Sequence, residues 1–492
     1  MVKLNGNTLS ISNMVAVARD EVEVTISSGA EERINQASRI VKNILKVNRK
    51  VYGVTTGFGY RQNTTISPQD TQKLQNNLVI SHASGVGPEF SREVVRGMML
   101  LQINKFARGH SGIRLKVVSL LLNLLNKNIT PIVPSQGSLG ASGDLAPLAH
   151  LALVLIGRGF AYHGETRVSG LRALEMAGLT PVELSAKEGL ALLNGTQAMT
   201  SLAALAVSDA EYLVKIANIA TSMSMEVLQA NIDALNPRIH QARPHEGQID
   251  TAKTILEFLK GSKRIRENIA FQDSYSLRCA PVVHGATLDA IRYVKRIVEI
   301  EMNSSTDNPL IFSLDQILSG GNFHGQPIAF AMDFLGITVA GLGTISERRI
   351  ERLLNPTLSG LPAFLSLKGG INSGFMIAQY TAASLVSENK QLAFPSSVDS
   401  IPVSANQEDH VSMGTISANK TRKIVEHVQY ILAIELLCVS QAIDIAEIQD
   451  QLAPTTLEVY QKIRRAIPML LEDRELSPDI NTCVELIRNR QL

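Results

Sequence analysis

Long stretches of helical periodicity without proline are the feature of this sequence that most restricts its fold. Residues 198–231 contain no proline, and their apolar side chains recur at mostly helical spacings: Leu202, Leu205, Leu213, Ile216, Ile219 and Met223. Similar patterns cover residues 286–303, 327–353, 376–390 and 417–446. Aromatic residues make up only 4% of the chain and tryptophan is absent, so the core must be aliphatic, as in packed helices. These features predict a mainly α-helical fold built as a long-helix bundle.

The N-terminal part of the chain is expected to be smaller and richer in loops than the bundle. Strand candidates are few and short, at Glu21–Ile26 and Val51–Thr55, and the segments 53–59, 131–143 and 319–327 have the glycine and proline content of loops. We therefore expect an N-terminal region over residues 1–200 and a long-helix bundle with C-terminal helices over residues 201–492. The boundary is approximate, and one continuous unit is the alternative. Because long bundle helices expose wide apolar flanks, we expect the chain to form oligomers.

Composition excludes several classes of protein. The formal net charge is +2, with 47 basic and 45 acidic residues, which does not resemble the footprint of a nucleic-acid-binding protein, since that needs a basic stripe. The cysteines, Cys279, Cys438 and Cys483, are too widely spaced for a disulfide framework or a zinc site. The N-terminus lacks the apolar core of a signal peptide, and no uninterrupted apolar run reaches about 18 residues, so no membrane span is expected. We therefore expect a cytoplasmic protein.

One tripeptide, Ala141-Ser142-Gly143, is able to convert its own backbone into an electrophile. If the Gly143 nitrogen attacks the Ala141 carbonyl carbon and water leaves, an imidazolone ring forms, and loss of a second water turns Ser142 into a methylidene group. Glycine suits the attacking position because it has no Cβ to obstruct the approach. Taken alone, the tripeptide is also compatible with a Gly-rich turn before a helix, with Asp144 as the N-cap.

The surroundings of the tripeptide carry a family resemblance. Residues 137–150, Gly-Ser-Leu-Gly-Ala-Ser-Gly-Asp-Leu-Ala-Pro-Leu-Ala-His, resemble the signature of the aromatic amino-acid ammonia-lyases. Further landmarks of that family follow in order at 51–59, 78–83, 193–197, 272–279, 320–325 and 404–414, and the last three most resemble the histidine-acting members. The resemblance implies removal of an α-amino group and a β-proton from an amino acid. It also implies a 4-methylidene-imidazol-5-one formed by the chain itself, no external cofactor, and a homotetramer with shared active sites.

The resemblance assigns catalytic roles beyond the tripeptide Ala141, Ser142 and Gly143. Tyr52 matches the base, Tyr275 matches a residue that hydrogen-bonds near the electrophile or the substrate amine, and Asn194 matches a donor to the imidazolone oxygen. A free phenol has a pKa near 10, so Tyr52 needs neighbouring donors or positive dipoles to act at neutral pH. Without the resemblance, a buried tyrosine with a satisfied hydroxyl is the favoured interpretation of Tyr52, and the motif match reverses this.

Substrate-binding roles follow from the same matches. The Arg278 guanidinium is the candidate for the substrate carboxylate, which it could bind bidentately, with Gln272 nearby on the chain. Phe323 matches a residue that packs over the ring, and His82 matches a residue at the side-chain end of the substrate. Glu408 stands where relatives acting on phenylalanine or tyrosine carry a neutral glutamine.

The substrate prediction depends mainly on Glu408. A carboxylate pairs with an imidazole, whereas against a phenyl ring it would be an unpaired and costly charge. The resemblance therefore implies conversion of L-histidine to trans-urocanate and ammonia, without a nucleic acid or membrane partner. A tyrosine or phenylalanine ammonia-lyase, or a 2,3-aminomutase on the same scaffold, is the alternative, followed by a non-catalytic helical scaffold. Gln407-Glu408-Asp409-His410 lacks the histidine spacing of a zinc helix, so we expect no metal.

Overall fold

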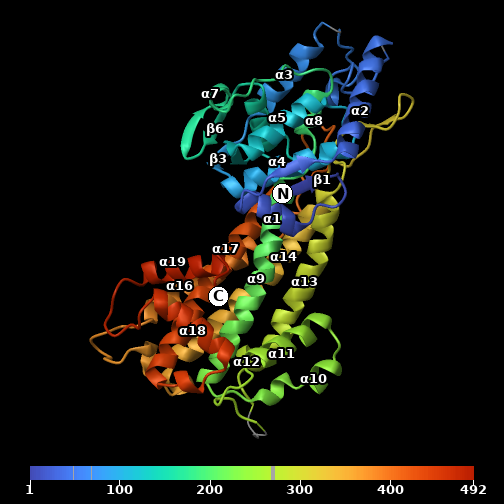
Figure 1. The fold of residues 1–492 in the computed structure, drawn as a ribbon. Coiled ribbons are helices and arrows are strands. Elements are labelled where there is room, and N and C mark those ends of the chain that lie inside the picture. The colour runs from blue at the N-terminus through green and yellow to red at the C-terminus, as the bar shows by residue number, and fades with distance from the viewer. Residues whose placement is uncertain (48, 68, 268–271) are drawn as a thin grey trace. The chain divides into compact units, whose positions relative to one another are not determined.

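The computed structural model describes residues 1–47, 49–67, 69–267 and 272–492, and it divides into two compact units. Unit 1 comprises Met1–Ser208, Lys295–Asp333 and Pro395–Asn419, and unit 2 comprises Asp209–Val294, Phe334–Phe394 and Lys420–Leu492 (Figure 1). The division at Ser208 falls near the expected boundary, but later segments interleave between the units. The expected domains at 1–200 and 201–492 stay a prediction, because compactness does not test whether a segment folds independently.

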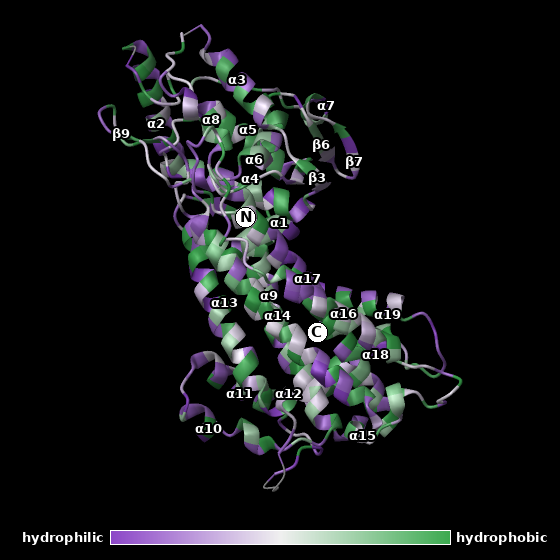
Figure 2. Cartoon of the chain, turned by 180° about the vertical axis from the view of Figure 1, so that it is seen from behind, coloured by the Kyte–Doolittle hydropathy of each residue, from purple (hydrophilic) through white to green (hydrophobic). Residues whose placement is uncertain are grey.

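The predicted long helices are present, and the mainly α-helical fold class is confirmed. They are α9 (Gln197–Val227), α13 (Ala280–Met302), α14 (Gln326–Leu354), α16 (Met376–Leu392) and α17 (Gly414–Ala446). Figure 2 shows green and purple residues alternating along α13 and α14, as expected of helices that bury one face. Four of these helices, α9, α13, α14 and α17, contain residues of both units.

Unit 1 contains the shorter N-terminal helices and the strands. The helices are α1 (Ile11–Arg19), α2 (Ser28–Lys46), α3 (Thr71–His82), α4 (Arg92–Ala107), α5 (Leu115–Asn126), α6 (Leu145–Leu155), α7 (Gly170–Met176), α8 (Glu188–Leu193) and the 3-10 turn η1 (Gly59–Arg61). The strands are β1 (Val2–Leu4), β2 (Val24–Ile26), β3 (Val86–Glu89), β4 (Ile129–Pro131), β5 (Pro134–Gln136), β6 (Phe160–His163), β7 (Thr166–Ser169), β8 (Leu310–Ile311) and β9 (Ile317–Leu318). β1 pairs with β2 in parallel, and the pairs β3–β5, β4–β6, β6–β7 and β8–β9 are antiparallel.

The strand predicted at Val51–Thr55 is wrong. The Val51 carbonyl accepts hydrogen bonds from the amides of Val54 and Thr55, at 3.1 and 3.0 Å, so this segment forms a turn. Gly53 has φ +66°, a conformation that an extended strand cannot use. β2 covers only the last part of the candidate Glu21–Ile26.

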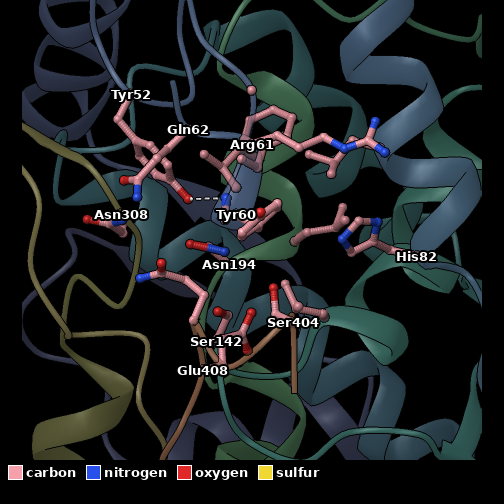
Figure 3. A pocket seen from close by; sticks show the side chains of 18 of the residues that line it. Tyr52, Tyr60, Arg61, Gln62, His82, Ser142, Asn194, Asn308, Ser404 and Glu408 are labelled. Atoms are coloured by element: carbon pink, nitrogen blue, oxygen red, sulfur yellow. Dashed lines mark hydrogen bonds between the residues drawn. The ribbon is translucent and has the colours of Figure 1, made fainter. Parts of the chain in front are cut away.

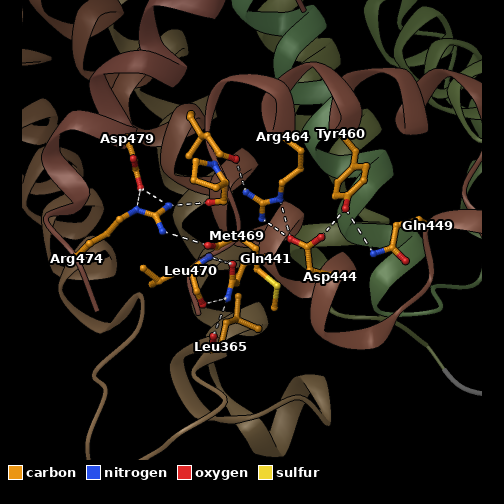
Figure 4. Close-up of polar contacts among 12 residues, drawn as sticks. Leu365, Gln441, Asp444, Gln449, Tyr460, Arg464, Met469, Leu470, Arg474 and Asp479 are labelled. Atoms are coloured by element: carbon orange, nitrogen blue, oxygen red, sulfur yellow. Dashed lines mark hydrogen bonds and ion pairs between the residues drawn. The ribbon is translucent and has the colours of Figure 1, made fainter. Parts of the chain in front are cut away.

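Unit 2 combines its parts of the long helices with short helices. These are η2 (Ile232–Leu235), α10 (Pro237–Gln241), α11 (Glu246–Phe258), α12 (Tyr275–Arg278), α15 (Pro356–Ser359), η3 (Ala363–Leu365), η4 (Gln449–Gln451), α18 (Pro454–Ala466) and α19 (Leu476–Arg488). Polar contacts attach α18 to α17: Asp444 accepts from the Tyr460 hydroxyl at 2.5 Å and from Arg464 Nε at 2.7 Å (Figure 4). Gln441 exchanges hydrogen bonds with the main chain of Leu470, which fixes the segment after α18.

Two helices, α14 and α17, are long and apolar enough to cross a membrane by length and composition alone. The most apolar 18-residue windows of these helices are 56% and 83% buried within the chain. Burial of this kind is also a property of core helices, so the two helices are weak evidence for a membrane span.

Candidate active site

A pocket of about 1090 Å³ in unit 1 brings together residues from several loops and helix ends. The predicted site residues that line it are Tyr52, His82, Ala141, Ser142, Asn194, Phe323 and Glu408. Figure 3 shows Ser142 and Glu408 close together, with Asn194 beside them and His82 on another wall. These residues are far apart in the sequence, so their convergence is a property of the fold.

The tripeptide lies in a tight turn before α6 that only glycine can complete. Gly143 has φ +76°, and its backbone forms a bridge with Gly195. A Cβ added to Gly143 would lie 2.1 Å from the Gly195 carbonyl oxygen and 2.6 Å from its carbonyl carbon, both of which are backbone atoms. The other side of the turn is also fixed, because the Gly140 carbonyl accepts the Ser412 hydroxyl at 2.9 Å. The turn therefore holds the Gly143 nitrogen and the Ala141 carbonyl within one confined segment.

Asp144 follows the tripeptide and fixes this turn. It stands at the N-cap position of α6, but its side chain makes no capping hydrogen bond to that helix. Instead the carboxylate accepts the amides of Ala198 and Met199 at 2.8 and 3.0 Å, at the N-terminus of α9, where the helix dipole favours an anion. The Ser138 and Thr415 hydroxyls also donate to it, at 3.1 and 2.5 Å. Burial raises the pKa of Asp144, and these hydrogen bonds oppose the rise.

Tyr52 is half-buried in the turn where a strand had been expected. Its hydroxyl oxygen accepts a hydrogen bond from the Gly59 amide at 3.1 Å (Figure 3). The segment that carries Tyr52 and Gly59 also lines the pocket at Phe58. A main-chain N–H directed at the phenol oxygen is the kind of donor that a tyrosine base requires.

His82 ends α3 on the wall of the pocket. Its Nδ1 lies 3.1 Å from the Ser81 hydroxyl, and burial lowers the pKa of the ring, with the Leu78 carbonyl opposing. The lowered pKa favours the neutral ring at pH 7, and because Nδ1 is occupied, Nε2 is the nitrogen left to form a hydrogen bond with a bound group.

Glu408 is presented by a strained hairpin. Val403 and Glu408 pair across a turn in which Ser404, Ala405 and Asn406 have φ +55°, +54° and +63°. Non-glycine residues in this region are unfavourable, and such strain concentrates at functional sites. Ser142 and Glu408 lie close together in the pocket (Figure 3). Burial raises the pKa of Glu408, and its interaction with the Ser142 side chain opposes the rise.

Comparison with known proteins gives the family. A family model described as aromatic amino acid lyase matches residues 9–465. This chain belongs to the aromatic amino acid lyase family. The resemblance stated from the motifs is confirmed.

Relatives of this lyase cover its whole length. A curated histidine ammonia-lyase of Caldanaerobacter subterraneus subsp. tengcongensis is 51% identical over 494 aligned residues, which cover 100% of this chain and 97% of the relative. The crystal structure of histidine ammonia-lyase from Trypanosoma cruzi matches with a TM-score of 0.93 and 43% identity, covering 100% and 94% of the two chains. A tyrosine aminomutase from Streptomyces globisporus matches with a TM-score of 0.96 and 38% identity, covering 100% and 97%.

Four predicted site residues of the lyase do not line this pocket: Gly143, in the turn of unit 1 described above, and Gln272, Tyr275 and Arg278, which lie in unit 2. Arg278 donates to Gln272 Oε1 at 2.6 Å, and its guanidinium lies 4.8 Å from the centre of the Tyr275 ring. Tyr275 is 70% exposed. The Arg278 Nε atom is buried and has no hydrogen-bond partner among the described residues.

Several pocket residues had not been singled out from the sequence. Tyr60 and Arg61 follow directly after the landmark at 51–59, and His410 lies inside the landmark at 404–414, so motif adjacency was a usable signal. The His324 and His410 rings stack at 5.7 Å, although only their neighbours had been assigned roles. Asn308 also lines the pocket, but nothing in its sequence surroundings indicates this.

A metal site is not evident among the residues that the structure describes, since they contain no group of three or more histidine, cysteine or acidic side chains that could hold an ion. The expectation that the enzyme needs no metal stays a prediction.

Proposed function

We propose that this lyase converts L-histidine to trans-urocanate and ammonia in the cytoplasm. The observation that carries the proposal is the Glu408 carboxylate, which lies in the pocket next to Ser142. A carboxylate in this place can pair with the imidazole of the substrate, whereas a phenyl ring would leave it unpaired. The name of the relative that is 51% identical over the full chain supports the same substrate.

The residues of the tripeptide turn fit a 4-methylidene-imidazol-5-one made from Ala141, Ser142 and Gly143. Gly143 is confined against Gly195 and has no room for a side chain, and the Ser142 hydroxyl faces a carboxylate. Once formed, this group would supply an electrophilic carbon that makes the substrate nitrogen a better leaving group. The Asn194 amide lies beside it in the pocket and is our candidate donor to the ring oxygen.

The other residues act on the substrate. Tyr52 removes the β-proton, aided by the Gly59 amide at its phenol oxygen. The neutral His82 ring hydrogen-bonds to the imidazole of the substrate, and Glu408 bonds to it or pairs with it. Phe323 lines the same pocket and limits the movement of the ring.

Residues of a second copy complete the site in this proposal, within a homotetramer. Arg278 would bind the substrate carboxylate through its guanidinium group. Tyr275 would reach the substrate amine, and Gln272 would orient Arg278. Exposed apolar side chains on α16, Ile377 at 55% and Tyr380 at 63%, are of the kind that an oligomer covers.

Substrate identity is tested by kinetics on L-histidine, L-tyrosine and L-phenylalanine, with absorbance of the conjugated acid and mass analysis of the products. We expect turnover of histidine to an unsaturated acid. Glu408→Gln should lower kcat/KM for histidine by about tenfold to a hundredfold, the value of a charge-assisted hydrogen bond. The matched control is Asp409→Asn, a neighbouring carboxylate at the same pocket, which should lose less. Turnover of tyrosine alone, or formation of a β-amino acid, would contradict the proposal and favour an aminomutase.

Site sharing is tested by mixing inactive copies. Tyr52→Phe and Arg278→Ala carry defects in different units. If sites are shared, refolding the two variants together should restore activity, because some sites then receive neither defect. A mixture as inactive as its components would show that each copy builds its own site. Light scattering on the wild type should give the mass of four copies.

A further inference from the structure

Lys105, on α4, is a buried amine next to the pocket that no step above uses. It is 1% exposed, and its Nζ donates to the carbonyls of Ala191 and Asn194 at 2.8 and 2.7 Å. Both carbonyls lie at the C-terminus of α8, where a helix leaves acceptors unsatisfied. Since water does not reach this place, Lys105 is the group that satisfies them.

The hydrogen bond from Lys105 Nζ to the Asn194 carbonyl connects Lys105 to a residue of the proposed site. Asn194 lines the pocket through its side chain, while its carbonyl is held by Lys105. The next carbonyl along the chain, that of Gly195, accepts the Asp144 amide at 2.7 Å and lies against Gly143. Two adjacent peptide units are therefore fixed, one by Lys105 and the next by the tripeptide turn.

The charge of Lys105 depends on its buried neighbours. Burial lowers the pKa of its amine to about 7, while the negative charge of Asp307 opposes this and the positive charge of Lys187 adds to it. Lys187 and Asp307 form their own fully buried ion pair at 2.9 Å. The two carbonyl acceptors match the two N–H groups of a neutral amine.

From this geometry we infer that Lys105 is a positioning residue for the proposed reaction: it fixes the Asn194 main chain and, through Gly195, the turn that forms the electrophile. The inference rests on the proposed function. Lys105 touches neither substrate nor electrophile, so its effect is on placement, and small displacements in an active site are costly.

The test compares Lys105→Met and Lys105→Gln with Arg96→Met. Methionine has about the same length as lysine but no donor, whereas glutamine keeps an NH₂ group. Arg96 is the matched control because it is also buried on α4 and donates to main-chain carbonyls, those of Val17 and Leu125, away from the pocket residues. Three quantities are measured. Intact mass gives the number of waters lost from the chain, kinetics on histidine give kcat and KM, and urea unfolding between pH 6 and about 10 gives the stability.

In Lys105→Met, we expect a fraction of the chains to retain both waters, which means that their tripeptide has not formed the electrophile. The kcat should fall about tenfold or more with little change in KM. Lys105→Gln should recover part of both losses, and Arg96→Met should lose stability only. Because the folded amine releases its proton near 7 and the unfolded one near 10.5, stability of the wild type gains from rising pH in that window. The unfolding constant of Lys105→Met divided by that of the wild type should therefore increase with rising pH, by up to about tenfold per pH unit.

The inference would be overturned if every Lys105→Met chain lost both waters, as in normal formation of the electrophile, and if its kcat stayed within about twofold of wild type. So would insolubility of both Lys105 variants beside a soluble Arg96→Met, since Lys105 would then serve the fold itself. If the wild type does not act on histidine, the proposed substrate fails, but the mass comparison still tests Lys105.

Discussion

Gly143→Ala provides the sharpest test of the electrophile-forming turn. Gly143 has φ +76°, and an added Cβ would lie 2.1, 2.6 and 3.0 Å from the carbonyl oxygen, carbonyl carbon and nitrogen of Gly195. These are backbone atoms, and the Gly195 carbonyl is already bonded to the Asp144 amide at 2.7 Å. The neighbour therefore cannot rotate away, as a flexible side chain could.

Gly164→Ala is the matched control. Gly164 has φ +60°, and a Cβ there would meet nothing within 4 Å. A left-handed alanine costs about 1–2 kcal/mol at either site, and forced contacts in a packed interior add about 1–3 kcal/mol at Gly143 alone. We expect Gly164→Ala to lose about 1–2 kcal/mol of unfolding free energy and Gly143→Ala to lose about 2–5 kcal/mol.

Two measurements check this prediction. Urea unfolding at fixed protein concentration gives the stabilities, with Ser142→Ala as the reference because it also cannot form the methylidene. The intact mass of Gly143→Ala should retain both waters, while Gly164→Ala should lose both. If Gly143→Ala lost both waters and unfolded like Gly164→Ala, the confinement of the turn would play no part in its chemistry.

Other predictions concern the site and unit 2. Ser142→Ala should keep its circular dichroism but lose activity and the weak absorbance shoulder beyond the tyrosine band. Because burial raises the pKa of Glu408, kcat/KM for histidine should fall with decreasing pH from a higher pH than an exposed glutamate would give, and Glu408→Gln should lack that fall. Exhaustive dialysis against a chelator should leave substantial activity; a loss restored only by a metal ion would reveal an unrecognised ligand set. Glu435→Gln should cost about 3–5 kcal/mol in urea unfolding, because the fully buried Arg349 then lacks its carboxylate partner.

Helical periodicity was sufficient to predict the long helices. The stretch 286–303 lies in α13 up to its last helical residue, Met302, and the stretch 417–446 lies entirely within α17. A long run of apolar residues at helical spacing has no other regular way to be buried. Val51–Thr55 shows the limit of this approach. Its β-branched residues favour a strand, but a glycine with positive φ and main-chain bonds to Val51 produce a turn.

The candidate site was only partly accessible from the sequence. Motifs indicated Tyr52, Asn194 and Glu408 because these lie in contiguous landmarks, and the structure places them on one pocket. Asn308 and Lys105 gave no such signal. A lysine in an apolar helix has the same local pattern whether its amine is solvated or buried, and only tertiary packing decides between these states.

Each half of the proposed site contains a fully buried basic side chain that donates to the main chain beside a site residue. In unit 1, Lys105 bonds to the Asn194 carbonyl. In unit 2, Arg349 forms a bidentate pair with Glu435 at 2.5 and 2.8 Å and also donates to the Ser276 carbonyl in α12, between Tyr275 and Arg278. A buried ion pair contributes little net stability beyond what an apolar pair of similar size would give, so the value of these side chains lies in directing hydrogen bonds that an apolar side chain cannot make. Replacing Lys105, or Arg349 and Glu435 together, with apolar residues of similar size should therefore impair catalysis more than its effect on stability predicts.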